Sequence, residues 1–222
     1  MTAYRQLVLR KRLILAILTL LLLCSVLLDL ALGPARYSLS EVLGALLSPD
    51  SAAPQVRVVM WDIRLPVALM AVAVGAALSL AGAQMQTILN NPLASPFTLG
   101  LSAAASFGAA MGLAFGVALF PLAAQYMVPV NAFIMAMLCA LLIHFLSLRR
   151  GVTAETIVLL GIALVFTFNA LLALVQFFAT EQAVAAVVFW TMGSLTKATW
   201  SKLGVICLVI LITLPIFAKR AW

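Results

Sequence analysis

Charged residues are scarce in this chain of 222 residues. They make up 9% of it, whereas 66% of the residues are hydrophobic, and an ordinary soluble domain is about a quarter charged and about half apolar. A soluble fold cannot hide so much apolar surface, because a small domain leaves much of its surface in water. The composition argues against a soluble enzyme, a disordered chain and a nucleic-acid partner, although the net charge is +7.

Residues that hold metals or form disulfides are also few. The three cysteines lie far apart in apolar runs, at Cys24, Cys139 and Cys207. No C-x-x-C or Cys/His spacing is present, so the pattern predicts buried thiols and no metal site. A lone histidine, His144, favours a local hydrogen bond over a proton relay.

Motifs for nucleotide binding and hydrolysis are absent. The chain has no G-x-x-x-x-G-K-[S/T], so it does not bind ATP through a P-loop. It also has no His-Glu-x-x-His or G-x-S-x-G, and an intramembrane enzyme would lack a visible catalytic set. We therefore expect no catalytic residue and no cofactor. Any uphill transport would draw its energy from a partner or from an ion gradient, and the lack of a carboxylate at mid-depth in the apolar runs favours the partner.

Long apolar runs are what the sequence does have. A bilayer core needs about 20 apolar residues per helix, and this predicts an all-α, multi-pass membrane protein whose single transmembrane domain covers residues 1–222. The first run could also be a secretory signal cut near Gly33, but its length favours a retained helix. The six expected spans are 13–32, 65–87, 97–120, 128–148, 156–178 and 200–218.

Basic residues give an expected orientation. Cytoplasmic segments are enriched in Lys and Arg, and an internal N-terminus places eight of the 13 basic residues inside, in three separate clusters. Both termini are therefore expected in the cytoplasm. The eight are Arg5, Arg10, Lys11, Arg12, Arg149, Arg150, Lys219 and Arg220.

Two expected outside segments contain short helices. Within 33–62, which Pro34, Pro49 and Pro54 interrupt, the pattern from Ser38 to Glu41 predicts a capped helix ending near Leu47. The segment 183–195 is apolar but too short to cross, so it is expected to be an interfacial or re-entrant helix.

Small residues recur at four-residue spacing in the second and third runs. The rows are Gly75, Ser79 and Ala83, and Gly108, Gly112 and Gly116. Close backbone contact drives helix association in lipid, so both runs are expected to be central. The rows are either packing surfaces alone or surfaces that slide during transport.

A tight reversal joins these two runs. Pro92 and Pro96 forbid a continuous helix there, Asn91 can satisfy backbone groups at the helix end, and Gly100 allows close approach where the third run begins.

Polar residues interrupt the fifth run. Three- and four-residue spacing puts Asn169, Ala173, Gln176 and Thr180 on one helical face. Polar groups at this depth must face protein or water. The face therefore either makes interhelical hydrogen bonds or lines a water-filled substrate path.

The segments 62–66 with R-L-P, 91–96 with N-P-L-A and 189–195 with W-x-M-G-S together resemble the FecCD-type permeases of bacterial ABC importers. The R-L-P, N-P-L-A and W-x-M-G-S elements occur in the same order and at similar spacing as in that family. The matching segments are 62–66, 74–83 (which includes Gly82), Gln86, 91–96 with 99–100, 159–163, 189–195 and Trp200.

The resemblance implies import of a ferric siderophore, haem or cobalamin across the bacterial inner membrane by alternating access. It implies a ten-helix permease, a second permease half or homodimer partner, a cytoplasmic ATPase and a periplasmic binding protein. It makes Arg64 a docking residue for the binding protein. Val67 stands where the family usually has another arginine, so either docking is weaker here or Arg57 is the substitute. It also assigns Asn169 and Gln176 to the substrate path.

Family members continue beyond six helices, and this sequence ends at Trp222. The chain is thus expected to be a truncated, split or incomplete permease for an iron chelate. The alternative is a membrane scaffold or remnant that occupies a partner without transport.

Overall fold

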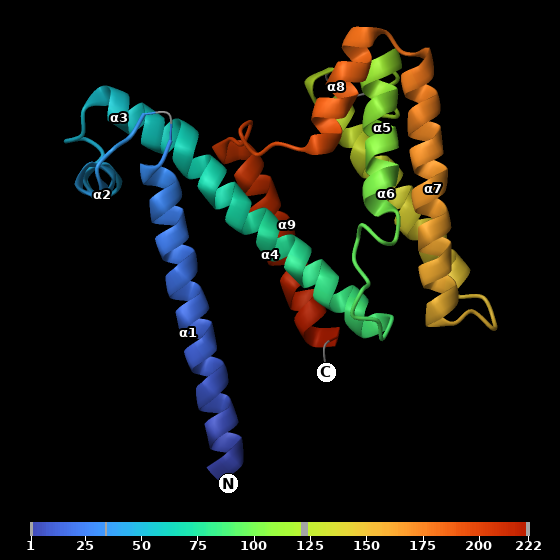
Figure 1. Cartoon of the computed structure of the whole chain (residues 1–222), viewed down its shortest axis with the longest axis horizontal. Coiled ribbons are helices and arrows are strands. Elements are labelled where there is room, and N and C mark those ends of the chain that lie inside the picture. The colour runs from blue at the N-terminus through green and yellow to red at the C-terminus, as the bar shows by residue number, and fades with distance from the viewer. Residues whose placement is uncertain (1, 34, 121–123, 221–222) are drawn as a thin grey trace. The chain divides into compact units, whose positions relative to one another are not determined.

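The computed structural model describes residues 2–33, 35–120 and 124–220, and it is helical with no strand in these ranges (Figure 1). The expected break at Pro34 and the chain ends at Met1 and Trp222 lie outside the described residues. Within the described ranges, five helical stretches are long and apolar enough to cross a membrane, one fewer than expected. They are Arg5–Ala31, Pro54–Ile88, Gln125–Ser147, Ala154–Phe178 and Trp200–Lys219.

The chain forms two compact units. Unit 1 contains Met1–Gly75 and Leu195–Trp222, and unit 2 contains Ala76–Ser194. The boundary falls inside one long helix, α4 (Leu65–Ile88), which contributes its first half to unit 1 and its second half to unit 2.

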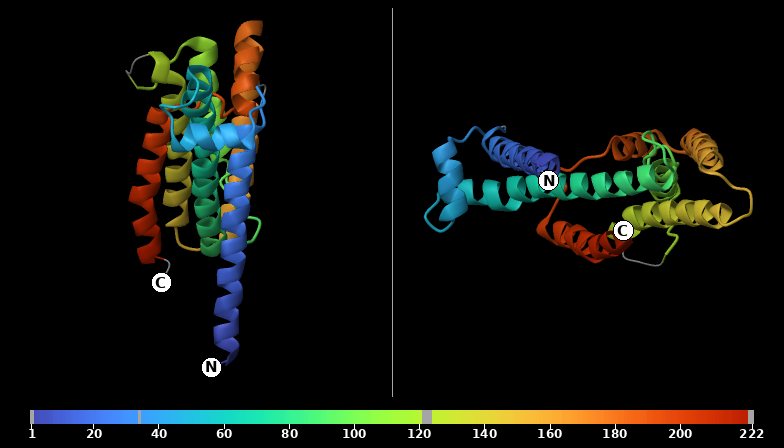
Figure 2. Two further views of the ribbon diagram at one scale, coloured as in Figure 1. Left: turned by 90° about the vertical axis from the view of Figure 1, so that its left-hand side faces the viewer. Right: turned by 90° about the horizontal axis from the view of Figure 1, so that it is seen from below.

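Unit 1 begins with α1 (Thr2–Ala31), which starts before the expected span and carries Lys11 in its basic first half. Most side chains of α1 are exposed, and no other helix of unit 1 lies beside its N-terminal part (Figure 2). The C-terminal end is different, because Leu30 is buried against α2 (Leu39–Leu47) and its neighbours.

The short helix α2 begins where the sequence predicts. The Ser38 side chain accepts a hydrogen bond from the Glu41 backbone N–H at 3.3 Å, and a Glu41 carboxylate oxygen accepts from the Ser38 backbone N–H at 2.8 Å. This reciprocal pair is a capping box, which satisfies donors that the first helical turn leaves free.

The next helical stretch starts earlier than expected, at Pro54. It consists of α3 (Pro54–Val58), a π-helical turn, η1 (Val59–Arg64), and α4. Pro66 has no backbone N–H and disturbs the normal hydrogen-bond ladder, and the wider turn just before it carries the helix past that position, with the Leu65 N–H donating to the Met60 carbonyl. Residues 54–64 therefore belong to a helix, whereas the sequence predicts a loop.

The final helix, α9 (Trp200–Arg220), packs on the unit 1 part of α4. Leu203 is buried with Met70 and Ala73. At the start of α9, the Trp200 indole N–H donates to the Trp61 carbonyl at 2.8 Å, and the two indole rings stack with centroids 6.2 Å apart.

Unit 2 is built around α5 (Leu101–Phe115). It packs against α6 (Ala124–Ser147), α7 (Ala154–Phe178) and α8 (Glu181–Met192), as Figure 1 shows. Small residues make this central position possible, because they let neighbouring backbones approach closely. The buried positions of α5 are Ala104, Gly108, Ala109, Ala110 and Gly112.

The expected third span, 97–120, is too long. The helix found there, α5, has 15 residues. At 1.5 Å per residue it is about 22 Å long, less than the roughly 30 Å of a bilayer core. Gly116 ends the helix with φ 65°, a left-handed conformation that glycine adopts at little cost. Hydropathy alone misses this end, because the residues after Gly116 remain apolar.

Candidate functional site

The polar residues of α7 lie on a face that the rest of unit 2 leaves open. Asn169 and Ala173 are exposed and Gln176 is half-buried. Neither the Asn169 nor the Gln176 amide has a hydrogen-bond partner among the described residues. The adjacent face of α7, roughly 100° around the helix axis, packs inward through Gly161, Leu164, Phe168, Leu172 and Val175.

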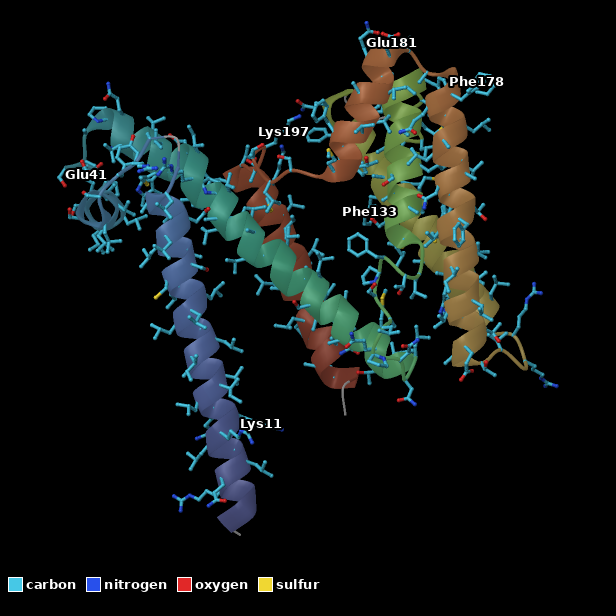
Figure 3. All side chains as sticks on the ribbon, in the orientation of Figure 1. Lys11, Glu41, Phe133, Phe178, Glu181 and Lys197 are labelled. Atoms are coloured by element: carbon cyan, nitrogen blue, oxygen red, sulfur yellow. The ribbon has the colours of Figure 1, made fainter. Side chains whose placement is uncertain are left out.

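Thr180 is not part of this face, which corrects the sequence expectation. The helix α7 ends at Phe178, and Thr180 begins α8, where its hydroxyl accepts a hydrogen bond from the Ala183 N–H at 3.4 Å. Phe178 and Glu181 lie at the same end of unit 2, on either side of this turn (Figure 3). The candidate path face is therefore reduced to three residues of α7.

Asn131 of α6 is a polar residue that the sequence reasoning missed. It is fully buried; its amide donates to the Val117 carbonyl at 2.6 Å and accepts from the Leu119 N–H at 2.9 Å. These bonds satisfy the irregular backbone that follows α5, and such backbone is tolerated at membrane depth only where protein or water satisfies it. In the sequence, the one feature that could have indicated this role is that Asn131 is an amide side chain in the otherwise apolar run 128–148.

The loop between α4 and α5 packs on α7. The Asn91 side chain accepts from the Leu93 N–H at 2.9 Å; this bond lies within the loop and does not reach the end of α4, so the expected role of Asn91 stays a prediction. The structure confirms close approach at Gly100, which has φ 80° and where a Cβ would lie 3.0 Å from the Leu164 Cβ. The backbone also packs closely at Gly161, since a Cβ there would lie 2.8 Å from the Leu99 Cα. Pro92 and Pro96 fall in the non-helical part of this loop, between Ile88 and Leu101.

The small-residue rows have different environments. In α5, a Cβ at Gly108 would lie 2.5 Å from the Asn131 carbonyl oxygen, so α5 and α6 are in close backbone contact there. In α4, Gly75, Ser79 and Ala83 are exposed, and a Cβ at Gly75 or Gly82 would meet no atom within 4 Å. The α4 row is therefore unoccupied in the described chain, and its packing role stays a prediction, as does that of Gly116, where a Cβ would also meet no atom within 4 Å.

Arg64 is held at the C-terminal end of α1. Its guanidinium donates to the Leu30 carbonyl at 2.5 Å and also to the Ala35 carbonyl, and it lies 5.1 Å from the centre of the Tyr37 ring. A cation is favourable at a helix C-terminus, where free carbonyls concentrate. Most of the binding capacity of Arg64 is thus used inside unit 1.

Arg57 is the more accessible of the two expected docking arginines. It forms an ion pair with Asp50 at 3.1 Å, and the two side chains are 54% and 93% exposed. Exposed pairs of this kind contribute little to stability, in general below about 1 kcal/mol. Arg57 can therefore exchange Asp50 for another carboxylate at small cost.

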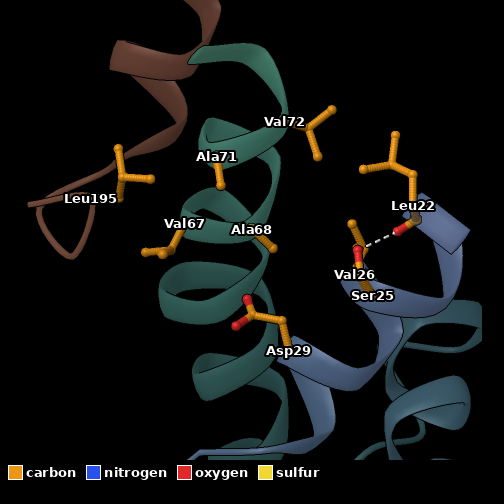
Figure 4. Close-up of a pocket in the computed structure, with 9 residues that line it drawn as sticks. All are labelled: Leu22, Ser25, Val26, Asp29, Val67, Ala68, Ala71, Val72 and Leu195. Carbon is orange, nitrogen blue, oxygen red and sulfur yellow. Dashed lines mark hydrogen bonds between the residues drawn. The ribbon is translucent and has the colours of Figure 1, made fainter. Parts of the chain in front are cut away.

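A groove of about 500 Å³ runs between α1 and α4 within unit 1. Its walls are mainly apolar, and Asp29 of α1 supplies a carboxylate near Ala68 (Figure 4). The Ser25 hydroxyl on the same wall donates to the Leu22 carbonyl at 2.8 Å and so is already satisfied.

Among the described residues, no group of three His, Cys, Asp or Glu side chains is placed to hold a metal ion. One carboxylate outside the membrane-spanning helices is perturbed: hydrogen bonds from the backbone N–H and then the hydroxyl of Ser38 lower the pKa of Glu41 below its ordinary 4.5.

Comparison with known proteins identifies related chains. The family model described as the FecCD transport family matches residues 20–221. A protein of Methanocaldococcus jannaschii, named as an ABC transporter permease, is 35% identical over 96% of this chain and 63% of its own length. The molybdate import system permease protein of Haemophilus influenzae is 31% identical over 92% of this chain and 60% of its own length.

A solved structure has the same fold. It is described as a metal-chelate type ABC transporter in an inward-facing conformation, and it superposes with a TM-score of 0.76 at 30% identity over 94% of this chain and 62% of that chain. Further relatives are named for iron chelatin, iron(3+)-hydroxamate and vitamin B12 transport. The chain thus spans somewhat over half of the length of the first relatives that it matches.

Proposed function

Because this chain belongs to the FecCD transport family, we propose that it is a permease subunit of a binding-protein-dependent ABC importer. The observation that carries the proposal is the shared fold, which covers 94% of the chain at 30% identity. The chain is a multi-pass membrane protein, and its relatives are permease subunits rather than enzymes. The proposed location is the bacterial inner membrane with both termini in the cytoplasm.

The proposed cargo is an iron chelate, a ferric siderophore. It is supported by relatives named for iron chelatin and hydroxamate import. Vitamin B12 and molybdate appear in the names of other relatives, and haem is a further alternative from the sequence resemblance. In the proposed mechanism of alternating access, a binding protein delivers cargo outside and a partner ATPase closes the helices around it.

Each group of site residues has a proposed task. Asn169, Ala173 and Gln176 line the cargo path, since their face of α7 holds polar groups without partners in the described chain. Arg57 and Arg64 help to dock the binding protein; Arg57 offers its charge directly, and Arg64 shapes the surface by fixing the end of α1. Gly75, Ser79 and Gly82 form a packing face on α4 for a helix from a partner, either a second copy or a chain that supplies further helices.

Co-purification tests the proposal. The tagged chain, extracted from its native membranes in a mild detergent, should retain a P-loop ATPase subunit and a second permease chain or copy. The control is another FecCD-type permease extracted from the same membranes in the same way. If the control retains its ATPase and this chain does not, the chain is a scaffold without transport and the proposal is wrong.

A further inference from the structure

A second hollow in unit 1 lies where α3, η1 and the start of α9 meet. This cleft encloses about 460 Å³, and its walls include Trp61, Trp200, Asp50, Arg57 and Asp62. It is separate from the polar face of α7, and none of the tasks proposed above uses its aromatic wall or Asp62.

The two indole rings form one fixed wall of the cleft. Their planes differ by 30° and their centroids are 6.2 Å apart. The Trp61 N–H donates to the Ala45 carbonyl at 2.9 Å and the Trp200 N–H to the Trp61 carbonyl at 2.8 Å. Because both polar atoms are already bonded, the rings are held in place and present their π faces and edges to an incoming group.

The charges in the cleft leave one carboxylate unbalanced. Arg57 is paired with Asp50 at 3.1 Å, so these two charges offset each other. Asp62 is exposed, and in the part of the chain that the structure describes it has no ion pair and no hydrogen-bond partner. The cleft therefore combines a rigid aromatic wall with a net negative charge, which together favour a cation.

We propose that this cleft receives a basic side chain, an arginine guanidinium, on the surface of the substrate-binding protein. The inference rests on the proposed function, because it names a contact of that partner. A guanidinium stacks flat on an aromatic face and donates two parallel hydrogen bonds to one carboxylate, and a wall of stacked indoles beside Asp62 offers both. A quaternary ammonium, as in a choline headgroup, prefers rings on several sides and donates no hydrogen bond.

The test measures binding of a small probe by the full chain in dodecyl maltoside, a detergent without a cationic headgroup. The chain is labelled with 5-fluorotryptophan, and single Trp→Phe variants assign its 19F resonances. N-acetyl-arginine amide should shift the Trp61 and Trp200 resonances with a dissociation constant of about 10 mM, the range for one stacked, hydrogen-bonded cation. The Trp190 resonance should not move, and N-acetyl-glutamine amide, the neutral control, should have no effect.

Two variants should change the affinity for the arginine probe in opposite directions. Asp62→Asn should weaken binding about tenfold, whereas Arg57→Gln, which removes a positive charge and frees Asp50, should tighten it. Asp29→Asn, a carboxylate change elsewhere in unit 1, should have no effect. Absence of saturable shifts, or equal binding by the Asp62→Asn chain, overturns the proposal; tighter binding of choline than of the arginine probe assigns the cleft to lipid and also overturns it. None of these outcomes depends on an ATPase, so the co-purification test stands independently.

Discussion

Asn131 on α6 donates a hydrogen bond to the carbonyl of Val117 at 2.6 Å, just after α5 has ended. The same amide accepts from the Leu119 N–H. One side chain thus takes over the backbone bonding that a full-length helix would have supplied to itself. This is how a 15-residue helix can stand at the centre of unit 2.

Replacement of this amide should destabilise the chain. Asn131→Leu leaves the Val117 carbonyl and the Leu119 N–H without the part-buried hydrogen bonds that they make to Asn131, at a cost of about 0.5–1.5 kcal/mol for each lost bond. The matched control is Asn169→Leu, the same change on an exposed residue with no partner in the described chain. Thermal unfolding in detergent should show a clearly lower stability for Asn131→Leu and little change for Asn169→Leu. Equal losses of stability would contradict the role of Asn131.

The glycines of α4 and α5 should respond differently to a methyl group. Gly108→Ala should lower stability, because the new Cβ would lie 2.5 Å from the Asn131 carbonyl oxygen and would force α5 and α6 apart. Gly82→Ala meets no atom within 4 Å and gains helix propensity, so the isolated chain should be unchanged or more stable by up to about 1 kcal/mol.

The same pair of variants tests the packing face of α4. If a partner helix lies on that face, Gly82→Ala should reduce co-purification of the second permease chain while the isolated chain stays stable. Unchanged assembly would show that no partner helix packs on Gly82.

Even the conservative replacement Arg64→Lys should lower the stability of the chain. Arg64→Lys keeps the charge but loses the fork of donors that reaches Leu30 and Ala35. We expect a loss of about 1–2 kcal/mol in unfolding free energy, measured by thermal or denaturant unfolding. Arg57→Lys, at an exposed ion pair, should change stability by less than about 0.5 kcal/mol. If both variants behave alike, the structural role of Arg64 is wrong.

Acid should open the first turn of α2. The folded pKa of Glu41 is lowered by its bonds to Ser38, so its contribution is present above the unfolded pKa and is lost as the pH falls through the folded pKa. Hydrogen exchange of the Glu41 and Val42 amides, corrected for intrinsic rates, should show protection that declines as the pH drops below the ordinary pKa of 4.5. In a Glu41→Gln chain this decline should disappear; if it persists, another group is responsible.

The sequence predicts best what local chemistry decides. The capping box of α2 needs only Ser38 and Glu41 three residues apart, and the short helix α8 follows from its length and flanking residues. The ends of α6, α7 and α9 also lie near the expected positions, because charge and polarity change sharply there.

What the sequence does not reveal depends on contacts between distant residues. The Asn131 amide, 15 positions after Gly116, bonds the backbone beyond the end of α5; the hydropathy of the run 97–120 does not mark this end, and Gly116 is the one local residue that favours it. Likewise, the assignment of Arg64 as a docking residue rests on its sequence motif, whereas its carbonyl partners at Leu30 and Ala35 lie about thirty positions earlier. Thr180 was placed by helical spacing that continues past the true end of α7.

The most direct test of the proposed cargo path is whether water reaches the polar face of α7. Cys24, Cys139 and Cys207 are replaced by alanine, and single cysteines are introduced by Asn169→Cys, Gln176→Cys and, as the control, Leu174→Cys. Leu174 is exposed on the same helix but lies roughly 140° around the axis from Asn169.

A membrane-impermeant, charged thiol reagent is applied to the complete transporter, both without nucleotide and with ATP and vanadate. We predict that the cysteines at 169 and 176 react in at least one of these states and that the cysteine at 174 reacts in neither. If positions 169 and 176 stay as unreactive as 174 in every state, the polar face does not line an aqueous path, and the central claim is contradicted.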